Sequence, residues 1–134
     1  MAKIEDIEGI GPAFAAKLNE AGVKTVEGLL ELGAQPKGRK DIAAASGISN
    51  DKILRWVNMA DLFRIKGVGE EYADLLEASG VDTVVELGRR NAANLHKAMT
   101  ELNAEKKLVR ALPAEKTVEG WVAQAKELPR GVHF

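Results

Sequence analysis

The sequence repeats itself at an interval of 58 residues, and this repeat constrains the fold more than any other feature. The first copy begins with Ile7-Glu8-Gly9-Ile10-Gly11, and the second begins with Ile65-Lys66-Gly67-Val68-Gly69. The pairs that match after these motifs are Ala15 and Ala73, Leu18 and Leu76, Gly22 and Gly80, Val23 and Val81, Thr25 and Thr83, Val26 and Val84, and Leu29 and Leu87. An internal repeat governs the architecture of a chain. We therefore interpret the sequence as a duplication.

Each copy contains a Gly-hydrophobic-Gly turn, residues 9–11 or 67–69, which we call the first and second glycine turns. Reversing the chain within two or three residues requires positive φ or close backbone approach, and glycine tolerates both. Ile10 and Val68 are expected to pack into the core. A short helix, this turn, a second helix and a terminating glycine form the pattern of a helix-hairpin-helix. Replacement of Gly11 or Gly69 by Val is therefore expected to destabilise the fold.

Local signals for helix starts and stops agree with this pattern. Pro12 suits the first position of a helix, and Gly22 and Gly80 suit the position just after a helix. Thr25 and Thr83 are expected to cap the next helices, with a capping box formed by Thr83 and Glu86. The apolar stripe predicted after the first turn consists of Phe14, Ala15, Leu18 and Ala21, and its counterpart of Tyr72, Ala73, Leu76 and Ser79.

Strand signals are sparse, and the residues between the glycines favour helix, which predicts an all-α protein. The predicted helices are residues 3–7, 12–21, 25–32, 39–46, 50–60, 61–65, 70–79, 83–88, 92–101, 104–110 and 115–127. Each copy ends in an amphipathic helix that carries Trp56 or Trp121. We expect tandem duplicated helix-hairpin-helix units, residues 1–62 and 63–134, packed through these helices into one compact helical body. The tryptophans are 65 residues apart, which places an insertion in residues 91–113.

Composition limits the classes of function. The chain has 134 residues, 46% of them hydrophobic, and no cysteine, which excludes disulfides and thiolate sites. No apolar run or signal region stands out, which predicts a cytoplasmic protein. His96 and His133 lack ligand-spaced partners, and no catalytic or cofactor-binding motif is found. We therefore expect no enzyme activity, no metal, no cofactor, no small-molecule substrate and no membrane partner. The net charge of −1 weighs against strong DNA binding.

The glycine turns are the first candidate site. In a helix-hairpin-helix, the turn amides and the start of the next helix can hold a phosphate without reading sequence. The residues predicted to bind it are Gly9, Ile10, Gly11 and Lys17 in the first copy and Lys66, Gly67, Val68 and Gly69 in the second. Glu70 and Glu71 would repel a phosphate at the second turn. The alternative is that both turns are only compact corners of the fold.

Residues 41–56 are a second candidate, because their small residues, Gly47 and apolar positions suit a helix-turn-helix. The exposed side chains would then be Ser49, Asn50, Asp51, Lys52 and Arg55. We favour the simpler interpretation, in which Gly47 ends one helix and Ser49 caps the next. Three basic clusters are a third candidate for contacts to phosphates. They are Lys37, Arg39 and Lys40; Arg89 and Arg90; and Lys106, Lys107 and Arg110, the last set on one helical face with Leu108, Val109 and Leu112 towards the core.

Three stretches carry a resemblance to a known family: PKGRKDIAAASGIS (36–49), ILRWVNMADLFRIKGVGEEYADLLEASGVDTVVEL (53–87) and NLHKAMTELNAEKKLVRALPAEKTVEGWVAQAKEL (94–128). The chain resembles a bacterial domain-of-unknown-function family of small proteins with two tandem helix-hairpin-helix units. That resemblance implies a fold but no activity. The turns are also similar to those of DNA-repair and recombination proteins that grip the duplex backbone, in which the first-turn side chains are neutral or basic. Glu70 and Glu71 depart from that pattern.

Two hypotheses on function follow. The first is sequence-nonspecific binding of a nucleic-acid backbone through the glycine turns and the basic clusters. The second is a protein-protein interaction or scaffolding module, in which the turns are structural corners. The motif favours the first hypothesis, and the near-neutral charge favours the second.

Overall fold

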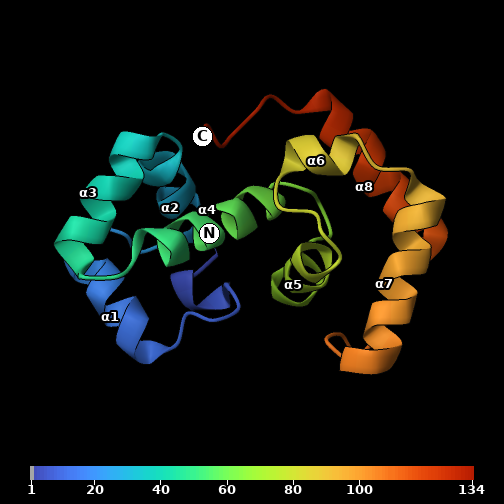
Figure 1. The fold of residues 1–134 in the computed structure, drawn as a ribbon, viewed down its shortest axis with the longest axis horizontal. Coiled ribbons are helices and arrows are strands. Elements are labelled where there is room, and N and C mark those ends of the chain that lie inside the picture. Colours follow the sequence, from blue (N-terminus) through green and yellow to red (C-terminus); the bar gives the residue numbers. More distant parts are fainter. Residues whose placement is uncertain (1) are drawn as a thin grey trace. The chain divides into compact units, whose positions relative to one another are not determined.

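Regular structure in residues 2–134, which the computed structural model describes, is helical (Figure 1). The elements are the 3-10 helix η1 (Ile4–Asp6) and the α-helices α1 (Pro12–Glu20), α2 (Val26–Gly33), α3 (Pro36–Ser46), α4 (Asn50–Leu62), α5 (Glu70–Ala78), α6 (Val84–Gly88), α7 (Ala92–Lys106) and α8 (Glu115–Glu127). Within this range the only β contact is an isolated bridge between Lys3 and Thr25. The predicted all-α class is confirmed. No helix of residues 2–134 has the length and apolar character needed to cross a membrane.

The chain divides into two compact units. The first runs up to Asp61 and includes Gly131–Phe134, and the second is Leu62–Arg130. The sequence interpretation assigns residues 131–134 to the second unit. They group with the first because the backbone N–H of His133 donates to the carbonyl of Ala34 at 2.8 Å. Arg39 Nη2 donates in turn to the carbonyl of His133 at 2.7 Å.

In the first unit, α4 packs on α1 through Trp56 and Phe14, and its Val57 lies beside Gly33 of α2. Helices α2 and α3 pack together, and α1 contacts both α3 and η1 (Figure 1). The buried residues of α4 include Ile53, Trp56, Val57 and Ala60, as its amphipathic pattern predicts. Trp56 is 2% exposed. The Trp-bearing helix therefore supplies the core of its own unit.

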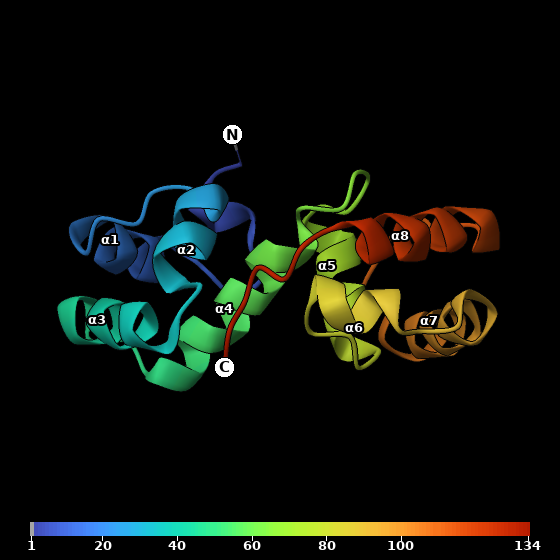
Figure 2. The same ribbon diagram turned by 90° about the horizontal axis from the view of Figure 1, so that it is seen from above.

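In the second unit, α8 is the central packing element. Both α6 and α7 pack against it, and α7 also contacts α5 (Figure 2). The predicted apolar face of α8 is buried and consists of Val118, Trp121, Val122 and Ala125. Trp121 is 2% exposed, the same as Trp56. Each tryptophan is thus a core residue of its own unit.

The glycines that follow α1 and α5 end these helices in the same way. Gly22 and Gly80 have φ of 91° and 93°. The N–H of Val23 donates to Leu18 O at 2.8 Å, and that of Val81 to Leu76 O at 2.9 Å. This bonding is a Schellman motif, which satisfies carbonyls that the helix end leaves open. The prediction that both glycines terminate helices is confirmed.

Threonine caps start the next helix in each unit. Thr25 Oγ1 accepts from the N–H of Gly28 at 2.9 Å, and Thr83 Oγ1 accepts from that of Glu86 at 3.5 Å. The predicted capping box is altered, because Glu86 Oε2 accepts from the N–H of Asp82 at 3.4 Å. Both threonines nevertheless cap as the repeat predicts.

Two predicted helices are wrong. Residues 61–65 form no separate helix, because α4 continues to Leu62 and the chain then turns. Residues 104–110 also form no helix of their own. Helix α7 runs on to Lys106, and Lys107 leaves it in the left-handed region at φ 51°. The Asn103 side chain then accepts from the N–H of Val109 at 2.9 Å, which turns the chain back.

Candidate nucleic-acid interface

The two glycine turns have the same burial pattern. Ile10 and Val68 are 4% and 6% exposed, as predicted, whereas the glycines on either side of them are exposed. Backbone N–H groups close both turns, from Ile10 to Ile7 O at 3.1 Å and from Val68 to Ile65 O at 3.1 Å. Each turn is therefore anchored by one apolar side chain and presents glycine backbone to solvent.

Only the first glycine of each turn requires the conformational freedom of glycine. Gly9 and Gly67 have φ of 96° and 93°, whereas Gly11 and Gly69 have φ of −85° and −115°. A Cβ on Gly11 or Gly69 would meet no atom within 4 Å. The prediction that a side chain at Gly11 or Gly69 would be strained in the folded protein is therefore wrong. At both positions the space beside the start of the following helix, α1 or α5, is open.

This difference in φ predicts different stabilities for two matched mutants, Gly9→Ala and Gly11→Ala. Gly9→Ala is expected to lower the free energy of unfolding by about 1–3 kcal/mol, because a side chain is strained at positive φ. Gly11→Ala is expected to change it by less than about 0.5 kcal/mol, since its φ is ordinary and the site is open. Urea denaturation followed by circular dichroism measures both. Equal losses in the two variants would contradict the assignment.

The helices that follow the turns begin without side-chain caps. Gly11 is the N-cap of α1 and Gly69 that of α5, and neither helix has a side-chain cap hydrogen bond. Pro12 is the first residue of α1 and has no N–H to satisfy. The next amides of a helix start lack intrahelical acceptors and carry partial positive charge. Both turns therefore present uncapped helix amides beside exposed glycine.

A tryptophan lies behind the first glycine of each turn. Trp56 Nε1 is 3.5 Å from the position that a Cβ on Gly9 would occupy, and Trp121 Nε1 is 3.3 Å from that on Gly67. An aromatic side chain of the following helix packs on each indole. The ring centroids of Phe14 and Trp56 are 5.2 Å apart, and those of Tyr72 and Trp121 are 5.3 Å apart. The two turns thus share the same aromatic support.

The start of α1 is neutral, with exposed Glu8 before the first turn and two lysines beside Phe14. Helix α1 has no acidic residue in its first turn. Lys17 Nζ lies 6.0 Å and Lys52 Nζ 5.9 Å from the centroid of the Phe14 ring. Both lysines are exposed, and neither forms an ion pair with another residue in the described part of the chain. Two ammonium groups are therefore available beside this turn.

The surroundings of the second turn are acidic. Glu70 and Glu71 occupy the first turn of α5. Arg110 Nε lies 3.7 Å from Glu71 Oε1, and Tyr72 Oη donates to Ala111 O at 2.8 Å. These side chains and the turn glycines line a hollow of about 380 Å³. Arg110, which reaches this turn, is therefore already paired with a carboxylate. Lys66, which precedes Gly67, is exposed, and its backbone N–H donates to Gln124 Oε1 at 3.0 Å.

The chain was compared with protein families, curated proteins and solved structures. A family model described as a domain of unknown function (DUF4332) matches residues 8–128. The chain belongs to this family. No curated protein and no solved structure matches it. The family match covers both glycine turns and both tryptophans, and its description names no activity.

The first basic cluster does not form one surface. Arg39 is 4% exposed, and its Nη1 donates to Gly33 O at 2.9 Å and to Ala34 O at 3.1 Å. Burial lowers the pKa of Arg39 below its ordinary value. Lys37 is exposed and pairs with Asp41 at 3.3 Å, and Lys40 is exposed. Arg39 is thus a structural residue that holds the end of α2 and the C-terminal segment.

The other two clusters are also divided. Arg90 is half-buried and its Nη1 donates to Ser79 O at 3.4 Å, whereas Arg89 is exposed. Lys106 ends α7 and Lys107 follows in the left-handed region, so these lysines and Arg110 do not share a helical face. Val109 is buried as expected, but Leu112 is 39% exposed. Among these clusters, Arg110 is the residue that the fold brings to a glycine turn.

The segment considered as a helix-turn-helix has the geometry of a tight corner. Gly47 ends α3 at φ 73°, and Ser49 Oγ accepts from the N–H of Lys52 at 3.4 Å. The exposed residues at the start of α4 include Asp51, Lys52 and Arg55. Lys52 lies beside Phe14. The start of α4 therefore contributes a cation to the surface around the first turn.

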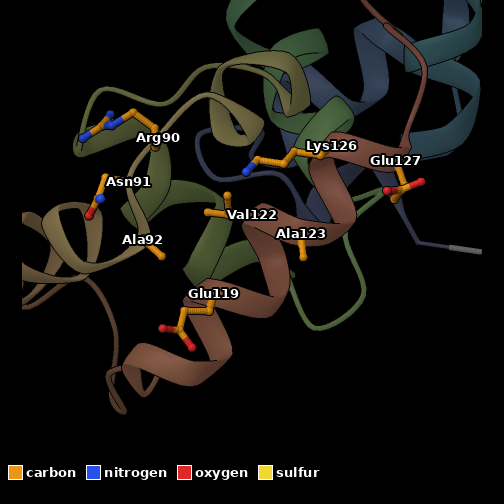
Figure 3. A pocket seen from close by; sticks show the side chains of 8 residues that line it. All are labelled: Arg90, Asn91, Ala92, Glu119, Val122, Ala123, Lys126 and Glu127. Atoms are coloured by element: carbon orange, nitrogen blue, oxygen red, sulfur yellow. The ribbon is translucent and has the colours of Figure 1, made fainter.

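The second unit also has a groove of about 380 Å³ between the start of α7 and α8 (Figure 3). Arg90, Asn91 and Ala92 line one side, and the side chains from α8 are Glu119, Val122, Ala123, Lys126 and Glu127. Asn91 Oδ1 accepts from the N–H of Asn94 at 3.0 Å and so caps α7. The lining mixes two basic with two acidic residues, which gives no preference for an anion.

Two residues near the first turn, Phe14 and Lys52, were not predicted from the sequence to belong to this site. Phe14 was expected on the buried stripe, but it is half-buried, whereas Ala15 and Leu18 are buried. Lys52 was assigned from the sequence to the candidate helix-turn-helix, because no periodicity connects it with residues 9–17. One sequence signal pointed to Phe14 as a residue of this site, because it is the third residue of a helix that follows an exposed glycine. His96 is half-buried as expected, with Nε2 3.0 Å from Pro113 O.

Proposed function

We propose that this protein binds nucleic-acid backbones without sequence preference, and that the first glycine turn is its main phosphate site. The turn is interpreted as the hairpin of a helix-hairpin-helix. The observation that carries the proposal is the open, uncapped start of α1 at Gly11, with Lys17 and Lys52 exposed beside it. Amides at a helix start and unpaired ammonium groups are both phosphate ligands.

The chemistry of this site explains the lack of sequence preference. Backbone amides and lysines contact phosphate oxygens, which are the same in every sequence. The basic groups release counterions when they bind, so affinity depends strongly on salt. With two nearby lysines and a net charge of −1, binding is expected to be weak, with a Kd of about 1–100 μM at physiological salt.

The second turn is proposed to contribute little in the natural protein. It has the same backbone geometry, but Glu70 and Glu71 place negative charge at the start of α5. Arg110 reaches this turn and lies beside Glu71. A phosphate would meet repulsion there, although the amides are of the kind that bind one. We therefore propose that, of the two duplicated turns, only the first binds phosphate in the natural protein.

The test is binding of short duplexes of unrelated sequence, measured by fluorescence anisotropy across a salt series. All duplexes are expected to bind alike, with log K falling against log salt by about 0.9 per phosphate contacted. Lys17→Glu with Lys52→Glu is expected to weaken every duplex and to flatten the slope by roughly one unit per lysine. The control, Lys106→Glu with Lys107→Glu, makes the same charge change at two exposed lysines of the second unit. Equal loss in both variants would overturn the assignment to the first turn.

A gain-of-function variant tests the second turn. Glu70→Gln with Glu71→Gln removes the repulsion and is expected to strengthen binding by several-fold. If neither the natural protein nor this variant binds DNA or RNA at low salt, the nucleic-acid proposal fails. The interaction-module hypothesis, which the near-neutral charge favours, would then replace it.

A further inference from the structure

The packing of the first glycine turn does not account for the Phe14 ring, which lies next to it. It is half-buried although the turn already has its apolar anchor in Ile10. It packs on Trp56 in an edge-to-face arrangement, with the ring planes at 60°, which holds the ring in place. Trp56 is itself 2% exposed and does not move freely. A fixed aromatic ring with part of its surface in solvent is therefore built beside the uncapped start of α1.

The ring and the phosphate-binding groups belong to one site. Phe14 is the third residue of α1, so it lies in the same helical turn as the open amides. Lys17 and Lys52, from α1 and α4, each approach within about 6 Å of the ring centroid. The acidic residues nearest in sequence to Phe14, Lys17 and Lys52 are Glu8, Glu20 and Asp51, and all three are exposed. Single-stranded nucleic-acid sites combine aromatic rings with nearby cations, and a base that stacks on Phe14 would displace the ammonium groups that lie over its ring.

The matched position in the second unit lacks these features. Tyr72 packs on Trp121 in a similar way, but its hydroxyl is committed to Ala111 O. The nearby cation Arg110 is paired with Glu71. The two units therefore share an aromatic pair, and the first unit combines it with unpaired lysines and a neutral helix start.

We propose that Phe14 is a stacking surface for an unpaired base, so that the first glycine turn prefers single-stranded nucleic acid to duplex. This inference rests on the proposed phosphate site. In a duplex the bases are stacked inside the helix, and a ring next to a phosphate site cannot reach their faces. In a single strand, the phosphate lies at the start of α1 and a neighbouring base stacks on Phe14. Stacking tolerates every base, so it adds affinity without sequence preference.

The test compares oligo-dT and oligo-U with a duplex of the same length by fluorescence anisotropy. The full chain is expected to bind either single strand about tenfold more tightly than the duplex. Phe14→Leu is expected to bring the ratio of single-strand to duplex affinity, measured in the same variant, close to one, and Phe14→Tyr is expected to retain the wild-type ratio. Tyr72→Leu, the matched change in the second unit, is expected to leave it in place. A preference that survives in Phe14→Leu would overturn the inference.

A second measurement does not depend on a variant. An oligonucleotide that contains 5-iodouracil is crosslinked to the natural protein by light, and the modified peptide is identified by mass spectrometry. Crosslinking at Phe14 is expected, and crosslinks only elsewhere would overturn the inference. Equal binding of single strands and duplex, still sensitive to Lys17 and Lys52, would remove this inference and keep the proposed function. No binding of either form would remove both.

Discussion

Arg39→Met is expected to lower the free energy of unfolding by about 2–4 kcal/mol. Arg39 is buried, and its guanidinium donates to Gly33 O, Ala34 O and His133 O at 2.9, 3.1 and 2.7 Å. Methionine fills similar space but donates no hydrogen bond, so carbonyls at the end of α2 would lose their partner. Each buried polar group left without a partner costs about 1–3 kcal/mol. Urea denaturation followed by circular dichroism measures the loss.

Two further variants separate the role of Arg39 from simple loss of charge. Lys40→Met removes a cation from the neighbouring, exposed position and is expected to change stability by less than about 0.5 kcal/mol. Arg39→Lys should lie between the wild type and Arg39→Met, because one ammonium cannot reproduce the fork of a guanidinium. If Arg39→Met is as stable as Lys40→Met, Arg39 does not hold this part of the unit together.

Trp56→Ala is expected to lower the free energy of unfolding of the first unit by about 3–5 kcal/mol. The indole is 2% exposed and supports both the first glycine turn and the Phe14 ring. Truncation to alanine leaves a cavity that these groups cannot refill without moving. Trp121→Ala is expected to have a similar effect on the second unit, because the contacts of Trp121 with Gly67 and Tyr72 are equivalent.

The chain has only two tryptophans, one in each unit, which makes the measurement specific. In Trp56→Ala, the remaining fluorescence reports the second unit, while circular dichroism reports all helices. The unfolding curve by circular dichroism is expected to shift to lower urea concentration. The milder Trp56→Phe keeps an aromatic ring and should lose less. Wild-type stability in Trp56→Ala would show that the indole does not support the first unit.

Much of the local structure followed from the sequence, because it depends on residues close together in the chain. Glycine after a helix, threonine before one, and apolar residues at helical spacing act over a few positions. The Schellman ends at Gly22 and Gly80 and the buried side chains of Ile10 and Val68 were predicted on that basis. The prediction of a separate helix at residues 104–110 was wrong because the Asn103 side chain, rather than backbone propensity, directs the chain at Val109.

What the tertiary structure decided is which polar side chains remain available to a ligand. The three basic residues at 37–40 look alike in sequence, but only Arg39 is buried, because carbonyls of α2 and of the C-terminal segment converge on it. Lys52 stands beside Phe14 because α4 packs on α1 through Trp56. The repeat by itself determined that there are two similar turns. The acidic Glu70 and Glu71 at the second turn were also evident from the sequence. The pairing of Glu71 with Arg110, a residue distant in the chain, was decided by the tertiary structure, because local sequence rules do not encode such a contact.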